Sequence, residues 1–301
     1  MNWIWTIAGV LLIVIGLNEV FHTVLHPTGR GRFTDLAAGT TWRLSSRLGR
    51  RIRSLAGPLA IVAVVTFWAA LQIVGWALVY LPFVPSGFAY PPDVPIGTYP
   101  RFVEALYFSA VSMSTLGLGD VYPVEPWLRL FAPVQALIGF ALLTASVSWF
   151  IELYPALGRR RALAMRIALM DRADMVRHLP EMEPATASAM LDALSAGLAQ
   201  THVDLLQNAE SYYFSEEDAA TSIAAQLPYA LRMARRARRS SERSVRNSGH
   251  MLEAGVDDFT RILRTRFAFT GEGTDEVLRE FARRHHQSPI PAGDDEDSRS
   301  A

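Results

Sequence analysis

The stretch Ser114–Asp120, "STLGLGD", decides how this sequence folds, because it places two glycines, a hydroxyl and a carboxylate between two long apolar segments, Gly57–Phe83 and Trp127–Tyr154. Irregular backbone at membrane depth is tolerated only where protein buries it or where it lines a water-filled path. Gly117 and Gly119 permit positive φ at alternating positions, which can turn successive carbonyls toward one axis. A ring of such carbonyls from several subunits can replace the water shell of a cation.

Three apolar segments approach the length that crosses a membrane, which is about 20 residues. Gly57–Phe83 and Trp127–Tyr154 reach it easily. The segment Trp3–Leu25 has only 15 apolar or weakly polar residues before Asn18 and Glu19. The sequence therefore predicts three spans, the first of them the weakest.

Composition excludes several classes of function. The 301 residues are 50% hydrophobic, carry a formal net charge of +0 and include no cysteine. A neutral balance gives nucleic-acid binding no support, and the lack of cysteine removes disulfides and thiolate chemistry. The scattered histidines His178, His202 and His250 lack metal-ligand spacing, and no glycine-rich nucleotide turn is present. We therefore expect no enzyme, no nucleic-acid partner, no cofactor and no metal beyond a permeant ion.

The arginines are distributed asymmetrically around the spans. Two clusters flank them, Arg30, Arg32, Arg43, Arg47, Arg50, Arg51 and Arg53 before the second span and Arg159, Arg160, Arg161 and Arg166 after the third. The connection Pro85–Pro100 carries only Asp93. The positive-inside rule predicts a multi-pass cell-membrane protein with an extracellular N-terminus and a cytoplasmic C-terminal half. No span has the regularly spaced arginines of a voltage sensor.

The segment before the glycines, Arg101–Ser114, predicts a short helix. About fourteen residues give roughly 20 Å of helix, which is too short to span a membrane, so this helix should enter partway and return. Its C-terminal end carries the negative pole of the helix dipole, which favours a cation beside it.

The stretch "ALYFSAVSMSTLGLGDVYP" followed by an apolar span resembles the pore loop of potassium channels, whose filter usually reads T-V-G-Y-G-D. The matching positions are Thr115, Leu116, Gly117, Gly119 and Asp120. Leu118 departs from the usual Tyr or Phe, although leucine occurs there in the second pore loop of animal two-pore-domain potassium channels. The resemblance covers Gly57–Tyr154, about a third of the chain.

The resemblance implies roles for single residues. Thr115, Leu116, Gly117 and Leu118 would supply carbonyls to permeant potassium ions, and Gly119 and Asp120 would form the outer mouth. Tyr107 and Phe108 match paired aromatics that brace the filter, and Tyr107 could bond Asp120. Val111 stands where some channels carry a glutamate. Gly139 matches a hinge glycine, or else allows close helix packing.

The predicted fold class is an all-α membrane protein with a potassium-channel-like pore domain made of outer helix, pore helix, filter and inner helix. We predict five segments: an N-terminal membrane helix at 1–26, a basic cytoplasmic linker at 27–54, the pore domain at 55–156, a cytoplasmic helical bundle at 157–287 and a disordered tail at 288–301. Helix breaks in the bundle are predicted near Pro180–Pro184, Ser215, Ser240–Ser241 and Gly271–Gly273.

Two further polar clusters stand out. Glu19, His22 and His26 share one helix face, where they could form a proton sensor or metal site, or more simply meet water or nearby arginines at the cytoplasmic interface. Arg232–Arg239, "RMARRARR", could bind anionic lipid headgroups or form a solvated helix face.

These features together predict a potassium-selective channel. Each chain supplies one pore loop and four loops surround an axis, so we expect a homotetramer in contact with membrane lipid. Two alternatives stay open: a weakly selective cation channel, which Leu118 favours, and a non-conducting membrane receptor that acts through its cytoplasmic helices.

Overall fold

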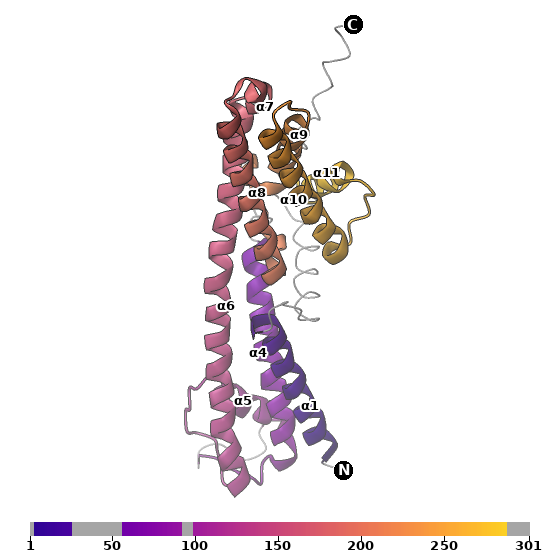
Figure 1. The fold of residues 1–301 in the computed structure, drawn as a ribbon. Helices are drawn as coiled ribbons and strands as arrows, with labels where there is room; N and C mark the ends of the chain where they lie inside the picture. Colours follow the sequence, from indigo (N-terminus) through magenta and orange to yellow (C-terminus); the bar gives the residue numbers. More distant parts are fainter. Residues whose placement is uncertain (1–2, 26–55, 92–98, 288–301) are drawn as a thin grey trace. The chain divides into compact units, whose positions relative to one another are not determined.

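The structure, a computed structural model, describes residues 3–25, 56–91 and 99–287 (Figure 1). The chain divides into two compact units whose boundary falls between Glu152 and Leu153, and each is described by itself. The predicted linker at 27–54, His26 and the predicted tail at 288–301 lie outside the described residues.

The first unit contains the predicted membrane helices. Its elements are α1 (Trp3–Val20), the π-helical turn η1 (Phe21–Leu25), α4 (Ala56–Tyr80), the 3-10 turn η2 (Leu81–Phe83), α5 (Arg101–Met113) and the first part of α6 (Pro126–Arg172). Trp3–Val24, Gly57–Phe83 and Pro126–Arg172 are long and apolar enough to cross a membrane. The three predicted spans and the all-α class are confirmed.

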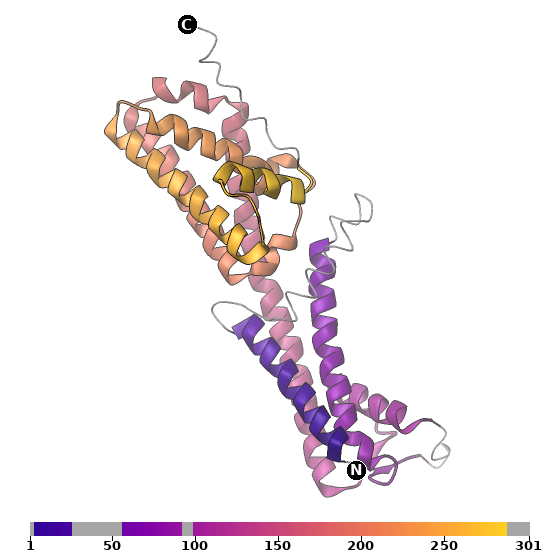
Figure 2. The ribbon, with the colours of Figure 1, turned by 90° about the vertical axis from the view of Figure 1, so that its right-hand side faces the viewer.

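The weakest predicted span, α1, packs along α4 (Figures 1 and 2). A Cβ on Gly75 would lie 2.9 Å from Cγ1 of Ile13, and a Cβ on Gly9 would collide with the carbonyl of Gly75. Small residues let helix backbones approach closely in a membrane, where packing rather than hydrophobicity drives association. The glycines therefore explain how α1 docks.

The short helix α5 is held by an aromatic core. Phe108 lies edge-on to Tyr80 and Phe88, with ring centroids 5.0 and 4.9 Å apart. Such pairs contribute about 0.5–1.5 kcal/mol each beyond area burial. The two-residue strands β1 (Phe88–Ala89) and β2 (Tyr122–Pro123) pair antiparallel and close the ends of the loop that contains α5.

The second unit is a helical bundle. It contains the rest of α6, then α7 (Met175–His178), η3 (Leu179–Glu181), α8 (Pro184–Gln207), η4 (Ala209–Tyr213), η5 (Ala219–Thr221), α9 (Ile223–Arg238), α10 (Arg243–Phe267) and α11 (Thr274–Arg284). Leu191, Leu227 and Phe259 are among the buried side chains of its core. The helical character predicted for this part of the chain is confirmed.

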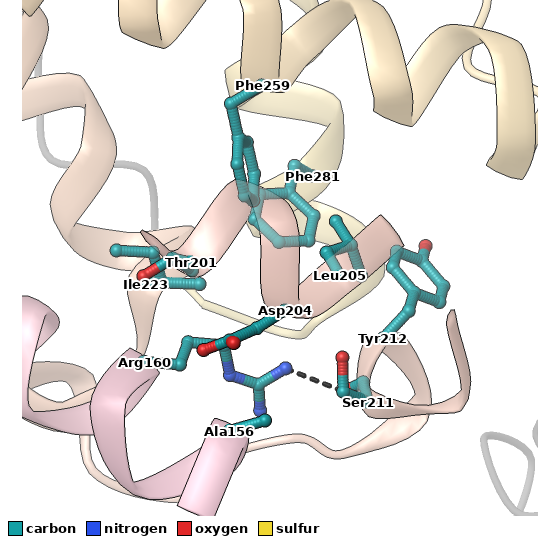
Figure 3. Close-up of a pocket in the computed structure, with 10 residues that line it drawn as sticks. All are labelled: Ala156, Arg160, Thr201, Asp204, Leu205, Ser211, Tyr212, Ile223, Phe259 and Phe281. Carbon is teal, nitrogen blue, oxygen red and sulfur yellow. Dashed lines mark hydrogen bonds between the residues drawn. The ribbon is translucent and has the colours of Figure 1, made fainter. Parts of the chain in front are cut away.

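All four predicted helix breaks are found, and Ser215 lies in the non-helical segment between η4 and η5. Ser215 caps no helix, and α9 begins only at Ile223, after Ser222. Within the intervening segment, the buried guanidinium of Arg160 donates to the carbonyl of Ser211 at 2.6 Å (Figure 3). It also donates to the carbonyl of Phe214 at 2.8 Å.

The basic residues that follow the third span form ion pairs within the bundle. Arg159 donates two bonds of 2.8 Å to the carboxylate of Asp204. Arg160 and Arg161 both contact Glu216, at 3.2 and 2.9 Å. Burial lowers the pKa of Arg160 from its ordinary value, and the nearby Glu216 offsets part of that effect. These arginines, which the sequence offered only as a topology signal, anchor the segment after α8.

The basic stretch Arg232–Arg239 is also engaged within the bundle. Arg235 pairs with Asp275 at 2.5 Å, and Arg238 bonds Glu253. Arg232 lies over the ring of Tyr229, 5.2 Å from its centroid. Arg232, Arg235 and Arg238 thus have acidic partners within the bundle, and lipid binding by this stretch stays a prediction.

Candidate ion-conduction site

The backbone between α5 and α6 alternates in handedness. Thr115, Gly117 and Gly119 have positive φ values of 58°, 56° and 76°. The glycines adopt this region at little cost, whereas a β-branched threonine rarely does so and is strained there. The sequence predicted the alternation at the glycines and missed its extension to Thr115, for which a single sequence carries no signal.

The side chains of this loop have little contact with their own subunit. Every residue from Ser114 to Gly119 is exposed, including the apolar Leu116 (62%) and Leu118 (57%). A Cβ on Gly117 or Gly119 would have no neighbour within 4 Å. The loop therefore projects from its subunit with its backbone accessible.

The end of α5 is closed by a tightened turn. The amides of Ser114 and Leu116 donate to the carbonyls of Ala110 (2.9 Å) and Val111 (3.2 Å), and the amide of Thr115 donates to Ser112 (3.1 Å). These bonds satisfy carbonyls that a helix end ordinarily leaves without partners. The loop thus starts from a fixed point.

The outer end of the loop is tied back to α5. The hydroxyl of Tyr107 donates to Oδ2 of Asp120 at 2.5 Å, which is the contact that the sequence suggested. Phe108 is buried in the aromatic core, and Val111 is half-buried. Val111 offers Asp120 no polar partner, so Tyr107 alone of the three predicted support residues holds this carboxylate.

Gly139 lies where α6 passes the end of α5. A Cβ built on it would lie 2.9 Å from the carbonyl carbon of Met113, and closer still to the oxygen. The helix is continuous through this position. The close-packing interpretation thus has a physical basis in the contact with Met113, and the hinge role of Gly139 stays a prediction.

The cluster on α1 is only partly described. Glu19 is buried (5% exposed), so it does not meet water in this structure. A contact with a nearby arginine stays a prediction, because the arginines predicted at 27–54 lie outside the described residues. His22 lies in the π-helical turn η1. Among the described residues no group of three His, Asp or Glu side chains could hold a metal ion.

The fold and this site define an all-α membrane protein with a short helix and an irregular loop between two spans. Residues 64–154 match the family model described as "Ion channel". This segment therefore carries an ion-channel domain, which points to transport rather than to an enzyme. It lies within the pore domain predicted at 55–156.

Two curated proteins are similar to parts of the chain. One is an "uncharacterized membrane protein YdjJ" of Bacillus subtilis (strain 168), 28% identical over 56% of this chain and 49% of that protein. The other is the "two-pore potassium channel 5" of Arabidopsis thaliana, 37% identical over 27% of this chain and 20% of that protein. The chain thus spans half or less of the length of these relatives. No solved structure matches it.

Proposed function

We propose that the protein is a potassium-selective channel and that four copies of the loop Ser114–Asp120 form its filter. The observation that carries the proposal is the alternation of positive φ at Thr115, Gly117 and Gly119. Alternating handedness allows successive carbonyls to face one side, as coordination of a dehydrated cation requires. The described part of the chain has one such loop, so a ring of four loops needs a homotetramer.

The charges and dipoles around the loop favour a cation that loses its water shell as it passes through the filter. Thr115 adds a hydroxyl to the carbonyls, the C-terminal pole of α5 is negative, and Asp120 places a carboxylate at the outer end. Lipid surrounds the spans, and permeant potassium is the only ion that the site needs. The similarity of part of the chain to a protein named as a potassium channel supports the same class of ion.

The test is conduction by the purified full chain in liposomes with potassium on one side and sodium on the other. A reversal potential displaced toward the potassium equilibrium potential is the expected result. Gly117→Ala should abolish the current, because alanine at φ 56° costs about 1–2 kcal/mol in each subunit. Gly158→Ala is the control, since its Cβ would meet nothing within 4 Å. Unchanged current in Gly117→Ala would remove the loop from the conduction path.

A weakly selective cation channel is the second candidate, and Leu118 favours it. Its side chain is 57% exposed and has no hydroxyl to bond behind the filter. The carbonyls next to Leu118 then lack a side-chain hydrogen bond behind them. A reversal potential of zero would select this candidate. Under potassium selectivity, Leu118→Tyr should increase the preference for potassium over sodium, provided that the phenol has room.

The proposed orientation places the N-terminus outside the cell membrane and the second unit in the cytoplasm. The chain contains no cysteine, so single cysteines can be introduced at Asn2 and at Ser298 without background. An impermeant thiol reagent added to intact cells should label the first and not the second. Labelling of both, or of Ser298→Cys alone, would reject the orientation.

A further inference from the structure

A fully buried polar network joins the helices behind the loop. Tyr80 of α4, Ser109 of α5 and Gln135 of α6 are each 0% exposed. The hydroxyl of Tyr80 donates to Oε1 of Gln135 at 2.8 Å. Nε2 of Gln135 donates to the carbonyl and to Oγ of Ser109, both at 2.9 Å. Oγ of Ser109 donates to the carbonyl of Ile73 at 2.7 Å.

Every polar group of the Gln135 side chain is used in this network. Its carbonyl oxygen accepts one bond and its amide donates two. Buried polar groups at membrane depth are expensive unless they are paired, and a fully paired network specifies one arrangement of the helices around it. An apolar side chain could fill the same space and hold the helices together, but it would not select one arrangement of α4, α5 and α6. Helix packing alone therefore does not account for a glutamine at this position.

The network sets a register between α5 and α6. Gln135 and Gly139 are four residues apart on α6, and their partners Ser109 and Met113 are four residues apart on α5. Residues at this spacing lie on one helix face. Two successive turns of α6 therefore contact two successive turns of α5. The second of these contacts is at Met113, and the filter loop begins at the next residue.

We propose that Gln135 is a positioning residue for the filter. By holding Ser109 against α4 and α6 it fixes the height and rotation of α5, and thereby the place from which the carbonyls of residues 115–118 project. Selectivity between potassium and sodium then depends on a side chain that touches no permeant ion. This inference rests on the proposed potassium conduction.

The test compares two glutamines with the same burial and different partners. Gln72 on α4 is 1% exposed and donates to the carbonyl of Ile13 on α1 at 3.1 Å, so its hydrogen bond joins α4 to α1 and not to α5. We expect Gln135→Leu to lower the potassium-to-sodium permeability ratio roughly fivefold or more, because two interhelical bonds to α5 are lost. Gln72→Leu should leave the ratio unchanged, and both variants should assemble like the wild type.

A second measurement decides the proposal without conduction. In lipid nanodiscs, hydrogen exchange of the backbone amides in residues 109–120 should be faster in Gln135→Leu than in Gln72→Leu. If Gln135→Leu does not assemble, Ser109→Ala serves in its place, since it removes the bond from Gln135 to Oγ of Ser109 and the bond from Oγ to the carbonyl of Ile73. Equal permeability ratios in the two glutamine variants, or equal exchange of residues 109–120, would overturn the positioning role.

The two hypotheses fail in different ways. If the wild-type protein passes no potassium current, the proposed function fails, and the exchange of residues 109–120 still shows whether Gln135 holds α5 in place. If the wild type is selective and Gln135→Leu is equally selective, the proposed function stands and the positioning role is rejected.

Discussion

Replacing Gly139 by alanine tests whether this glycine serves close packing or a hinge. In the structure the new Cβ would lie 2.9 Å from the carbonyl carbon of Met113. Carbon atoms reach their optimal contact at about 3.5–4.0 Å, so relieving this contact alone requires α5 or α6 to move by about 0.6 Å or more, and the closer contact with the carbonyl oxygen requires a larger movement. The displaced carbonyl belongs to the residue immediately before the filter loop.

The two interpretations predict opposite signs for the change in the free energy of unfolding. In an unobstructed helix, alanine stabilises by about 0.8–1.0 kcal/mol relative to glycine. Overpacking of a buried contact costs about 1–3 kcal/mol. If close packing governs, the net change is therefore between about zero and 2 kcal/mol of destabilisation in each subunit. If Gly139 is only a hinge, Gly139→Ala should be stabilising.

The assay is unfolding of the full chain in nanodiscs or mild detergent, with the reversal potential measured on the same variants. Gly158→Ala is the matched control, because this glycine also lies within α6 and its Cβ would have no neighbour within 4 Å. We expect Gly158→Ala to be stabilising, and Gly139→Ala to be less stable than Gly158→Ala and less selective than the wild type. Equal stabilisation by the two substitutions would refute the packing argument and favour the hinge.

Three further predictions concern single contacts. Tyr107→Phe leaves the carboxylate of Asp120 without its hydroxyl donor, at a cost of at most about 0.5–1.5 kcal/mol because the bond is exposed. It should make potassium currents decay faster in low external potassium, and stable currents would contradict the outer anchor. Arg160→Leu should destabilise the full chain by about 3–5 kcal/mol in chemical unfolding, because buried acceptors lose their partner. Arg161 is half-exposed, so Arg161→Leu should cost less than about 1 kcal/mol. Equal losses in the two variants would argue against a stabilising role for the buried bonds of Arg160. Burial, and secondarily nearby positive charges, lowers the pKa of His285 to about 3. The unfolded chain takes up a proton at this residue below about pH 6.5 and the folded chain does not, so the free energy of unfolding should fall from pH 7 to pH 5. If the buried imidazole causes this fall, His285→Gln should make the free energy of unfolding depend less on pH.

Local patterns in the sequence predicted the spans and the short helix. Apolar length indicated the three spans, and the glycine spacing indicated where the backbone departs from a helix. These features are determined by residues that are close together in the chain, so they can be read from a single sequence. The bond from Tyr107 to Asp120 was suggested only through the resemblance to potassium channels, because thirteen residues separate its partners.

Contacts between distant segments were not predictable in the same way. Gln135 looked like one polar residue in an apolar span, since its partner Ser109 lies 26 residues earlier. Arg160 and Arg161 were counted as charges that set topology, although both contact Glu216, 55 or more residues later. Each of these contacts depends on how one helix is rotated relative to another, and the spacing of apolar residues in the sequence does not determine that rotation.

The contacts around the loop bear on how a filter with leucine at position 118 could hold its carbonyls. Leu118 lacks the hydroxyl that a tyrosine would use, so the middle of the loop has no side-chain bond of that kind. The structure holds the loop at its two ends instead, at Asp120 through Tyr107 and, through α5, at Ser109 through Gln135. Loss of either anchor leaves one end fixed and frees the adjacent carbonyls. Tyr107→Phe should therefore act mainly on the outer carbonyls and Gln135→Leu on the inner ones, and the double variant should lose more selectivity than the two single losses combined.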